Sequence, residues 1–236
     1  MAFRDPVGQP MSRRTLIAFG LLAALLSLPA TAATNKQNAT LASVIKKIQE
    51  QQKNTQTMQA TFRQEKELAL LSAPEVSTGT FVFSKPNNVL WSYEAPKRVQ
   101  MLIANGALTT YFPDLKKAER IDVKRFEDRI FKYMGATGAI DELAKFFDFT
   151  FTDNPKAGTY VLDLTPKNKA VTKRVRRIKI WIDKSSYITS KVEYVEGDGD
   201  ITRYEFTNVK INEAVPASRF VLNLPAGVKV EQMKIQ

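Results

Sequence analysis

Residues 79–93 read GTFVFSKPNNVLWSY. Large apolar side chains occupy every second position on either side of the segment KPNN: Phe81, Phe83, Val89, Trp91 and Tyr93. A period of two is typical of a β-strand with one buried face, and Pro and Asn between two such runs favour a turn. The stretch therefore predicts two antiparallel strands that share an aromatic face.

Similar strand patterns continue along most of the chain. Met58–Phe62 alternates in the same way, and Asn105-Gly106 between two apolar runs is the strongest hairpin signal in the sequence. Residues 196–200, EGDGD, form a second loop between strand-like runs. The later runs lie around Phe149 and at Tyr160–Leu164, Arg176–Ile182, Ile188–Val195, Thr202–Val209 and Phe220–Leu224.

Two regions carry helical spacing instead. Thr40 is a candidate N-cap for a helix with an apolar stripe at Leu41, Val44, Ile45 and Ile48. In residues 124–147, a first stripe is followed by the breaker Gly135–Gly138, and Asp141 caps or begins a second helix. The first stripe comprises Phe126, Ile130, Phe131 and Met134, and the second Ile140, Leu143, Phe146 and Phe147. Strands before and after these helices predict one domain, residues 33–236, with an antiparallel sheet under a helical cover.

The first 32 residues have the pattern of a signal peptide. Arg13 and Arg14 precede the apolar stretch Leu16–Leu28, and Ala30-Thr31-Ala32 supplies a small-residue cleavage site. This apolar stretch is shorter than the ~20 residues of a membrane-spanning helix. We therefore expect export to a bacterial envelope. Whether Met1 or Met11 is the start, and whether Sec or the twin-arginine route is used, stays open.

The composition restricts the chemistry. The chain has no Cys and no His, which removes disulfides, thiolate metal sites, a cysteine nucleophile and the commonest general base. No nucleophile elbow, phosphate loop or paired-carboxylate motif is present. The prediction is a binding protein rather than an enzyme, without cofactor or metal.

The formal net charge is +11, and the densest basic run lies between Lys167 and Lys179. Such a run fits docking to an anionic lipid or acidic partner surface, or a solvated hairpin, and the hairpin is the preferred interpretation. It lacks interleaved aromatic residues, which argues against nucleic-acid binding. The aromatic strands themselves fit two interpretations, a filled core or a ligand cavity inside a curled sheet, and composition does not separate them.

The motifs in this order resemble the LolA family of periplasmic lipoprotein carriers. The resemblance rests on residues 79–93 followed by Pro96, on Asn105-Gly106 and Tyr111-Phe112-Pro113, on Phe62-Arg63-Gln64, and on the ending FVLNLPAGVKV at residues 220–230. It implies an incomplete antiparallel β-barrel with an α-helical lid over a hydrophobic cavity. It also implies a monomer that accepts triacylated lipoproteins from an inner-membrane ABC transporter and passes them to an outer-membrane receptor where one is present.

The resemblance also implies roles for individual residues. The expected cavity residues are Phe62, Phe81, Phe83, Val89, Trp91, Tyr93, Met101, Ile103, Phe112 and Trp181. The expected lid residues are Phe126, Ile130, Phe131, Met134, Ile140, Leu143, Phe146 and Phe147. Lys85 stands where well-studied members have an arginine that holds the lid, and lysine lacks the guanidinium's five-donor fork. We therefore expect a lid that opens more easily or is latched elsewhere.

Of three other kinds of protein with this fold, one remains as an alternative. The lipoprotein receptor LolB needs a lipidated Cys, which this chain lacks. RseB-like regulators carry a second domain, for which the chain leaves too little room. A LolA-like paralogue that carries or senses another apolar ligand, such as a glycolipid or a fatty acyl compound, fits the sequence as well.

Overall fold

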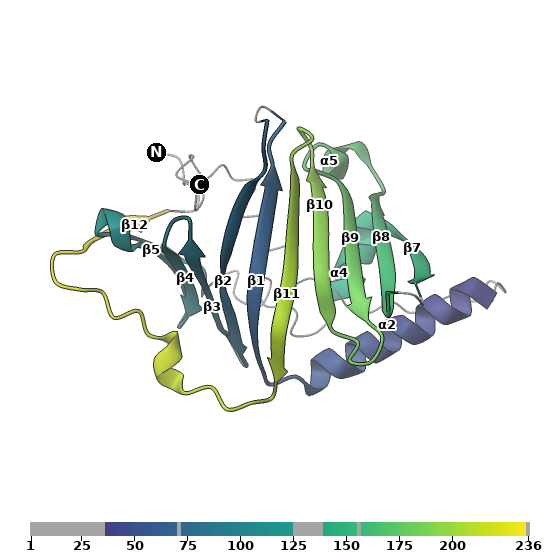
Figure 1. The fold of residues 1–236 in the computed structure, drawn as a ribbon, viewed down its shortest axis with the longest axis horizontal. Helices are drawn as coiled ribbons and strands as arrows, with labels where there is room; N and C mark the ends of the chain where they lie inside the picture. Colours follow the sequence, from purple (N-terminus) through teal and green to yellow (C-terminus); the bar gives the residue numbers. More distant parts are fainter. Residues whose placement is uncertain (1–35, 70–71, 125–138, 155–156, 235–236) are drawn as a thin grey trace.

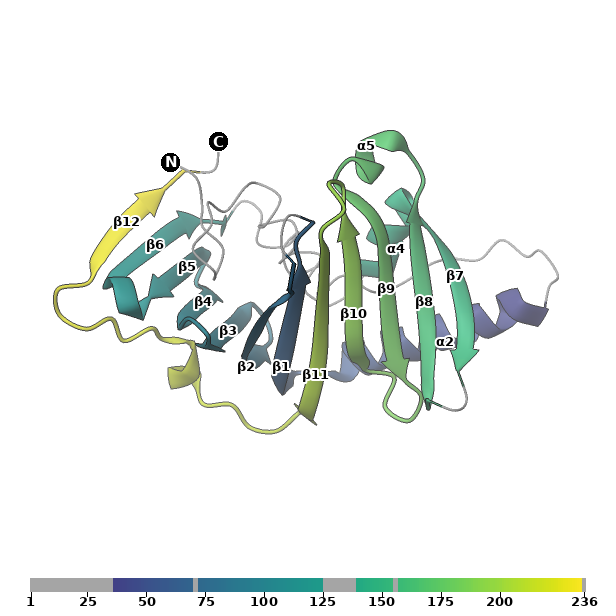
Figure 2. The same cartoon turned by 45° about the horizontal axis from the view of Figure 1, so that its top comes forward.

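The computed structural model of the protein describes residues 36–69, 72–124, 139–154 and 157–234. Its strands form a single sheet in the order β12-β6-β5-β4-β3-β2-β1-β11-β10-β9-β8-β7, which can be followed in Figure 1 and, for β6, in Figure 2. The strands are β1 (Thr57–Glu67), β2 (Glu75–Ser84), β3 (Asn88–Ala95), β4 (Val99–Ala104), β5 (Ala107–Phe112), β6 (Lys117–Asp122), β7 (Phe147–Asn154), β8 (Thr159–Pro166), β9 (Val175–Asp183), β10 (Thr189–Glu196), β11 (Ile201–Ile211) and β12 (Lys229–Met233). The helices are α2 (Lys36–Asn54), α4 (Ala139–Phe146) and α5 (Lys169–Thr172), with 3-10 turns η1 (Pro113–Leu115) and η3 (Ala217–Phe220).

The sheet curls but does not close. Neighbouring strands pair antiparallel, except that β12 lies parallel to β6. β12 and β7 stand at opposite ends of the strand order, and Figure 2 shows the sheet curving between them. The predicted incomplete antiparallel barrel with helices over it is thus confirmed.

Two backbone features in the first half of the sheet require particular residue types: a tight turn and a close contact between neighbouring strands. Asn105 and Gly106 connect β4 and β5 with φ angles of 52° and 72°, which fits the type I′ turn that an Asn-Gly pair predicts. Gly79 lies where a Cβ atom would be 2.0 Å from the carbonyl oxygen of Ser92 and 2.8 Å from the Phe62 ring. Only glycine fits there, and its missing side chain leaves space for that ring on the inner face.

Alternation along the strands gives the sheet two different faces. The concave face carries the large buried cluster, to which all the strands from β1 to β11 contribute. The convex face carries a smaller cluster over β2, β3 and β4: Val82, Leu90, Leu102 and Ala104. The burial pattern of β3, with Val89, Trp91 and Tyr93 inside, matches the predicted period of two.

The helices cover the concave face. Val44, Ile45 and Ile48 of α2 join the inner cluster, which confirms the predicted apolar stripe. The predicted cap at Thr40 is wrong, because Thr40 lies inside α2, whose described part already includes residues 36–39. α4 contributes the buried Leu143. The predicted stripe Phe126 to Met134 lies outside the described residues, and no helix within the described ranges is long and apolar enough to cross a membrane.

Residues 212–228, here called the C-terminal strap, cross the convex face. Phe220, only 7% exposed, packs on the convex cluster together with Val215 and Leu222. The strap then reaches β12 beside β6, as Figure 2 shows. The predicted strand at Phe220–Leu224 is therefore wrong, because this segment lies on a sheet face where the strand edges are already paired.

An ion network fixes the convex side of the central strands. Arg203 on β11 lies 2.7 Å from Glu193 on β10 and 3.2 Å from Glu65 on β1, and it also pairs with Glu67. These carboxylates raise the pKa of Arg203 further above its ordinary value. Because one guanidinium joins three adjacent strands, the convex surface holds β1, β11 and β10 in register.

Phe220→Ala tests the strap. We expect the free energy of unfolding to fall by about 3 kcal/mol, because the substitution empties a site on the convex cluster. The measurement is urea unfolding followed by far-UV circular dichroism. Val221→Ala is the matched control, since Val221 is 58% exposed, and its loss should stay within about 0.5 kcal/mol. Equal losses for the two variants would contradict an anchoring role for Phe220.

Candidate functional site

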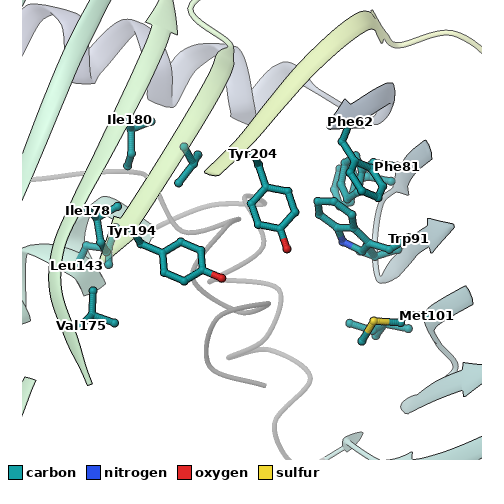
Figure 3. Close-up of a cluster of buried hydrophobic side chains, with 14 of the residues drawn as sticks. Phe62, Phe81, Trp91, Met101, Leu143, Val175, Ile178, Ile180, Tyr194 and Tyr204 are labelled. Atoms are coloured by element: carbon teal, nitrogen blue, oxygen red, sulfur yellow. The ribbon is translucent and has the colours of Figure 1, made fainter. Parts of the chain in front are cut away.

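An aromatic cluster forms the centre of the concave face, as Figure 3 shows. The Phe62 ring lies 4.9 Å from both the Trp91 and the Tyr93 ring, with edge-on geometry. Phe81 lies 4.7 Å from Trp91, and Tyr204 lies 5.7 Å from it. Edge-to-face packing at these distances stabilises the cluster beyond the area that it buries.

The other half of the concave face is aliphatic. Strands β8 and β9 contribute Leu162, Leu164, Ile178 and Ile180, each at most 2% exposed. In Figure 3, Leu143, Val175 and Ile178 lie across from the Phe62, Trp91 and Met101 group, with the Tyr194 and Tyr204 rings between the two groups. The concave face is thus a continuous apolar surface from β4 to β8.

A few neutral polar groups interrupt this surface. Gln64 donates a hydrogen bond of 2.8 Å to the hydroxyl of Tyr204, and the hydroxyls of Tyr93 and Tyr204 are 3.3 Å apart. Burial raises the pKa of Tyr194 well above its ordinary value, so its hydroxyl stays protonated at neutral pH. These groups can exchange hydrogen bonds with a ligand without placing a charge at the centre of the face.

Nine of the ten residues predicted for the cavity lie in the concave cluster. They are Phe62, Phe81, Phe83, Val89, Trp91, Tyr93, Met101, Ile103 and Phe112. Trp181 does not join them. On β9 it alternates with the buried Ile180 and Ile182, so it lies on the opposite face, where the ammonium of Lys191 is 5.4 Å from its ring.

Several inner residues were not predicted from the sequence. Tyr194, Tyr204, Ile178 and Leu162 are all buried in the cluster. The sequence shows the period-two pattern of their strands, but it does not show which side of each strand faces inward. That side is determined by the chain of strand pairings from β1 through β11, β10 and β9 to β8. The pairing of β1 with β11 joins residues more than a hundred positions apart, for which the local pattern has no signal.

The lid residues that the structure describes have different environments. Leu143 is 3% exposed within the concave cluster, whereas Phe146 is 41% exposed at the end of α4. Phe147 is the first residue of β7 rather than the last of the helix, and it is buried at 4% exposure. For Ile140 the structure describes only the helical backbone.

Lys85 joins the sheet to α2. Its ammonium donates hydrogen bonds to the carbonyl oxygens of Lys53, at 2.8 Å, and Gln52, at 3.3 Å. These carbonyls belong to the last turn of α2, where the helix dipole favours a positive charge. Partial burial lowers the pKa of Lys85. Lys85 therefore makes two hydrogen bonds to a helix that covers the concave face.

Two further contacts attach α2. Asn212, which follows β11, accepts a hydrogen bond of 2.7 Å from the Gln56 amide and donates one of 3.1 Å to the carbonyl of Asn54. Lys47 donates a hydrogen bond of 3.0 Å to the hydroxyl of Tyr187 between β9 and β10. The C-terminal end of α2 is thus fixed by polar contacts, and its middle by apolar contacts and the Lys47 hydrogen bond.

The site offers little to a metal ion or a general base. Across the described ranges no group of three or more carboxylates, His or Cys is placed to hold a metal ion. What the concave face can do chemically is to hold apolar groups away from water.

An open antiparallel sheet that curls around a helix-covered apolar face is the fold of the LolA superfamily. The family model described as "Outer membrane lipoprotein carrier protein LolA" matches residues 53–223, and the chain belongs to this family. Its relatives include two outer-membrane lipoprotein carrier proteins of Pseudomonas fluorescens. The one from strain Pf0-1 is 28% identical over 66% of this chain and 72% of its own length, and the one from strain Pf-5 is 25% identical over 88% and 97%.

A solved structure shows the same fold at low identity. The chain is similar to a conserved protein of Thermus thermophilus, with a TM-score of 0.53, 8% identity, and coverage of 82% of this chain and 99% of the other. At this identity the likeness concerns the fold alone.

Lys85→Ala tests the attachment of α2. We expect amide hydrogens in the last turns of α2 to exchange about tenfold faster, because a hydrogen bond to a charged donor contributes about 1.5 kcal/mol. Hydrogen exchange read by mass spectrometry measures this. Lys46→Ala, on the same helix and exposed, should leave exchange unchanged, and Lys85→Arg should keep the protection. Unchanged exchange in Lys85→Ala would show that α2 is held without it.

Proposed function

We propose that this protein is a periplasmic carrier that shields the acyl chains of lipoproteins on its concave face during transfer to the outer membrane. The observation that carries the proposal is the buried apolar surface that β1 to β11 build under α2 and α4. Membership of the LolA family supports the class of cargo.

The physical need for such a surface is large. Each methylene exposed to water costs about 0.8 kcal/mol, so an acyl chain of ~15 methylenes costs about 12 kcal/mol to move through water. Aromatic and aliphatic residues on a curled sheet offset that cost, and an unclosed sheet leaves a route for chains to enter and leave.

The rest of the proposal follows the family. The signal-like first 32 residues would export the chain, an inner-membrane ABC transporter would load it with triacylated lipoprotein, and an outer-membrane receptor would unload it where present. In this scheme the protein acts as a monomer without cofactor or catalysis. The helices form the lid, and Lys85 is its latch through α2.

Release from spheroplasts tests the proposal. Purified protein is incubated with spheroplasts that contain an active lipoprotein-releasing transporter, and the soluble fraction is analysed for triacylated lipoprotein. We expect a soluble one-to-one complex. With folded protein and an active transporter, no release would overturn the lipoprotein assignment and favour a paralogue for another apolar ligand, such as a glycolipid or fatty acid.

Quenching of the two tryptophans can show on which face of the sheet the acyl chains bind. Trp91 lies in the concave cluster, whereas Trp181 lies on the convex face. A triacylated lipopeptide with brominated acyl chains should quench the fluorescence of the Trp181→Phe variant, which keeps Trp91, by at least half. The Trp91→Phe variant, which keeps Trp181, should lose less than a tenth of its signal. Equal quenching of both variants would place the chains elsewhere.

A further inference from the structure

One corner of the concave face is charged, at the end of the sheet formed by β6 and β12. Lys117 and Glu119 are on the same side of β6 as Ile121, and register places Glu119 beside Thr110 of β5. Glu231 of β12 lies next to Glu119 in the parallel pairing. This set of Lys117, Glu119 and Glu231 is here called the acidic corner.

Within the acidic corner, one partly buried cation faces two carboxylates. The Lys117 ammonium lies 2.8 Å from Oε1 of Glu119 and 3.0 Å from Oε2 of Glu231. One cation thus serves two carboxylates, and these two partners raise the pKa of Lys117. Lys229 also pairs with Glu231, at 3.2 Å, but its side chain is 77% exposed and is screened by solvent.

One carboxylate oxygen of Glu119 has no hydrogen-bond donor among the described residues. The residue is 8% exposed, and its second oxygen, Oε2, is buried with no hydrogen-bond partner in the described part of the chain. A buried charged acceptor without a donor is costly, so the site gains free energy from any N–H or ammonium group that reaches it. An anionic group would be repelled by the two carboxylates.

The acidic corner adjoins apolar surface. Leu108, Phe112 and Ile121 lie on the same face of β5 and β6 and belong to the concave cluster. An amphiphile whose chains lie on that cluster would have its head group within reach of Glu119.

We propose that the acidic corner is a head-group subsite that binds an N–H donor attached to acyl chains, through Glu119. The inference rests on the proposed function and narrows its cargo. The lipid-modified N-terminal cysteine of a lipoprotein presents such a donor, as an amide when triacylated and as an ammonium when diacylated. A fatty acid, which presents a carboxylate, is disfavoured.

The first test uses the unmodified protein. Binding of dodecylamine and of laurate, which share a chain length, is measured at pH 7 by displacement of a fluorescent apolar dye. We expect dodecylamine to bind at least fivefold more tightly, although the protein's net charge of +11 favours the anion at long range. Equal binding, or tighter binding of laurate, would overturn the subsite.

The second test uses Glu119→Gln with di- and triacylated lipopeptides. We expect affinity for the diacylated lipopeptide to fall about tenfold, affinity for the triacylated one to fall two- to threefold, and affinity for laurate to rise. The matched control is Glu205→Gln, because Glu205 lies on the convex side of β11 and pairs with Lys191. This control variant should leave the affinities for both lipopeptides and for laurate unchanged.

The two proposals fail in different ways. Lipopeptide that does not bind the folded, unmodified protein would overturn the proposed function. Lipopeptide that binds the unmodified protein and Glu119→Gln equally would overturn only the subsite.

Discussion

The structure depends on one constraint: a sheet with an apolar concave face that does not close on itself. In a closed barrel the strands alone would seal the interior, but here β7 and β12 end the sheet. The concave face must therefore be covered by something other than strands, and α2 and α4 supply that cover. Most of the long-range contacts described above either build this face or attach its cover.

The two faces of the sheet have different roles: contacts on the convex face stabilise the sheet, and the concave face is available to a ligand. On the convex side, the C-terminal strap packs Phe220 over β2 to β4, and Arg203 joins β1, β11 and β10. These contacts stabilise the sheet without using the inner surface. The concave face is left with aromatic and aliphatic side chains that can contact a ligand, and the polar groups at its centre, Gln64, Tyr93 and Tyr204, are neutral.

The parts of the fold with a local physical cause were predictable. The Asn105-Gly106 turn and the alternation through Phe81 and Trp91 each follow from residue types within a few positions. The strap was not predictable, because residues 220–224 have the composition of a strand. They stay out of the sheet because they lie on the face of β2 to β4, whose edges are already paired. Trp181 shows the same limit for the site, since the period of two leaves open which side of a strand faces inward.

The attachment of α2 indicates how a carrier could bind tightly and still release. Each polar contact of Lys85 or Asn212 contributes on the order of 1 kcal/mol, so most of the attachment comes from burying Val44, Ile45 and Ile48. These residues contact the same apolar face that acyl chains would use. On the proposed function, an entering acyl chain replaces contacts between α2 and the concave face with contacts of similar energy between the acyl chain and that face. The net free energy of loading is therefore much smaller than the free-energy cost of exposing the acyl chain to water. Release then needs only a modest competing surface, because the helix returns to the face that the chain leaves.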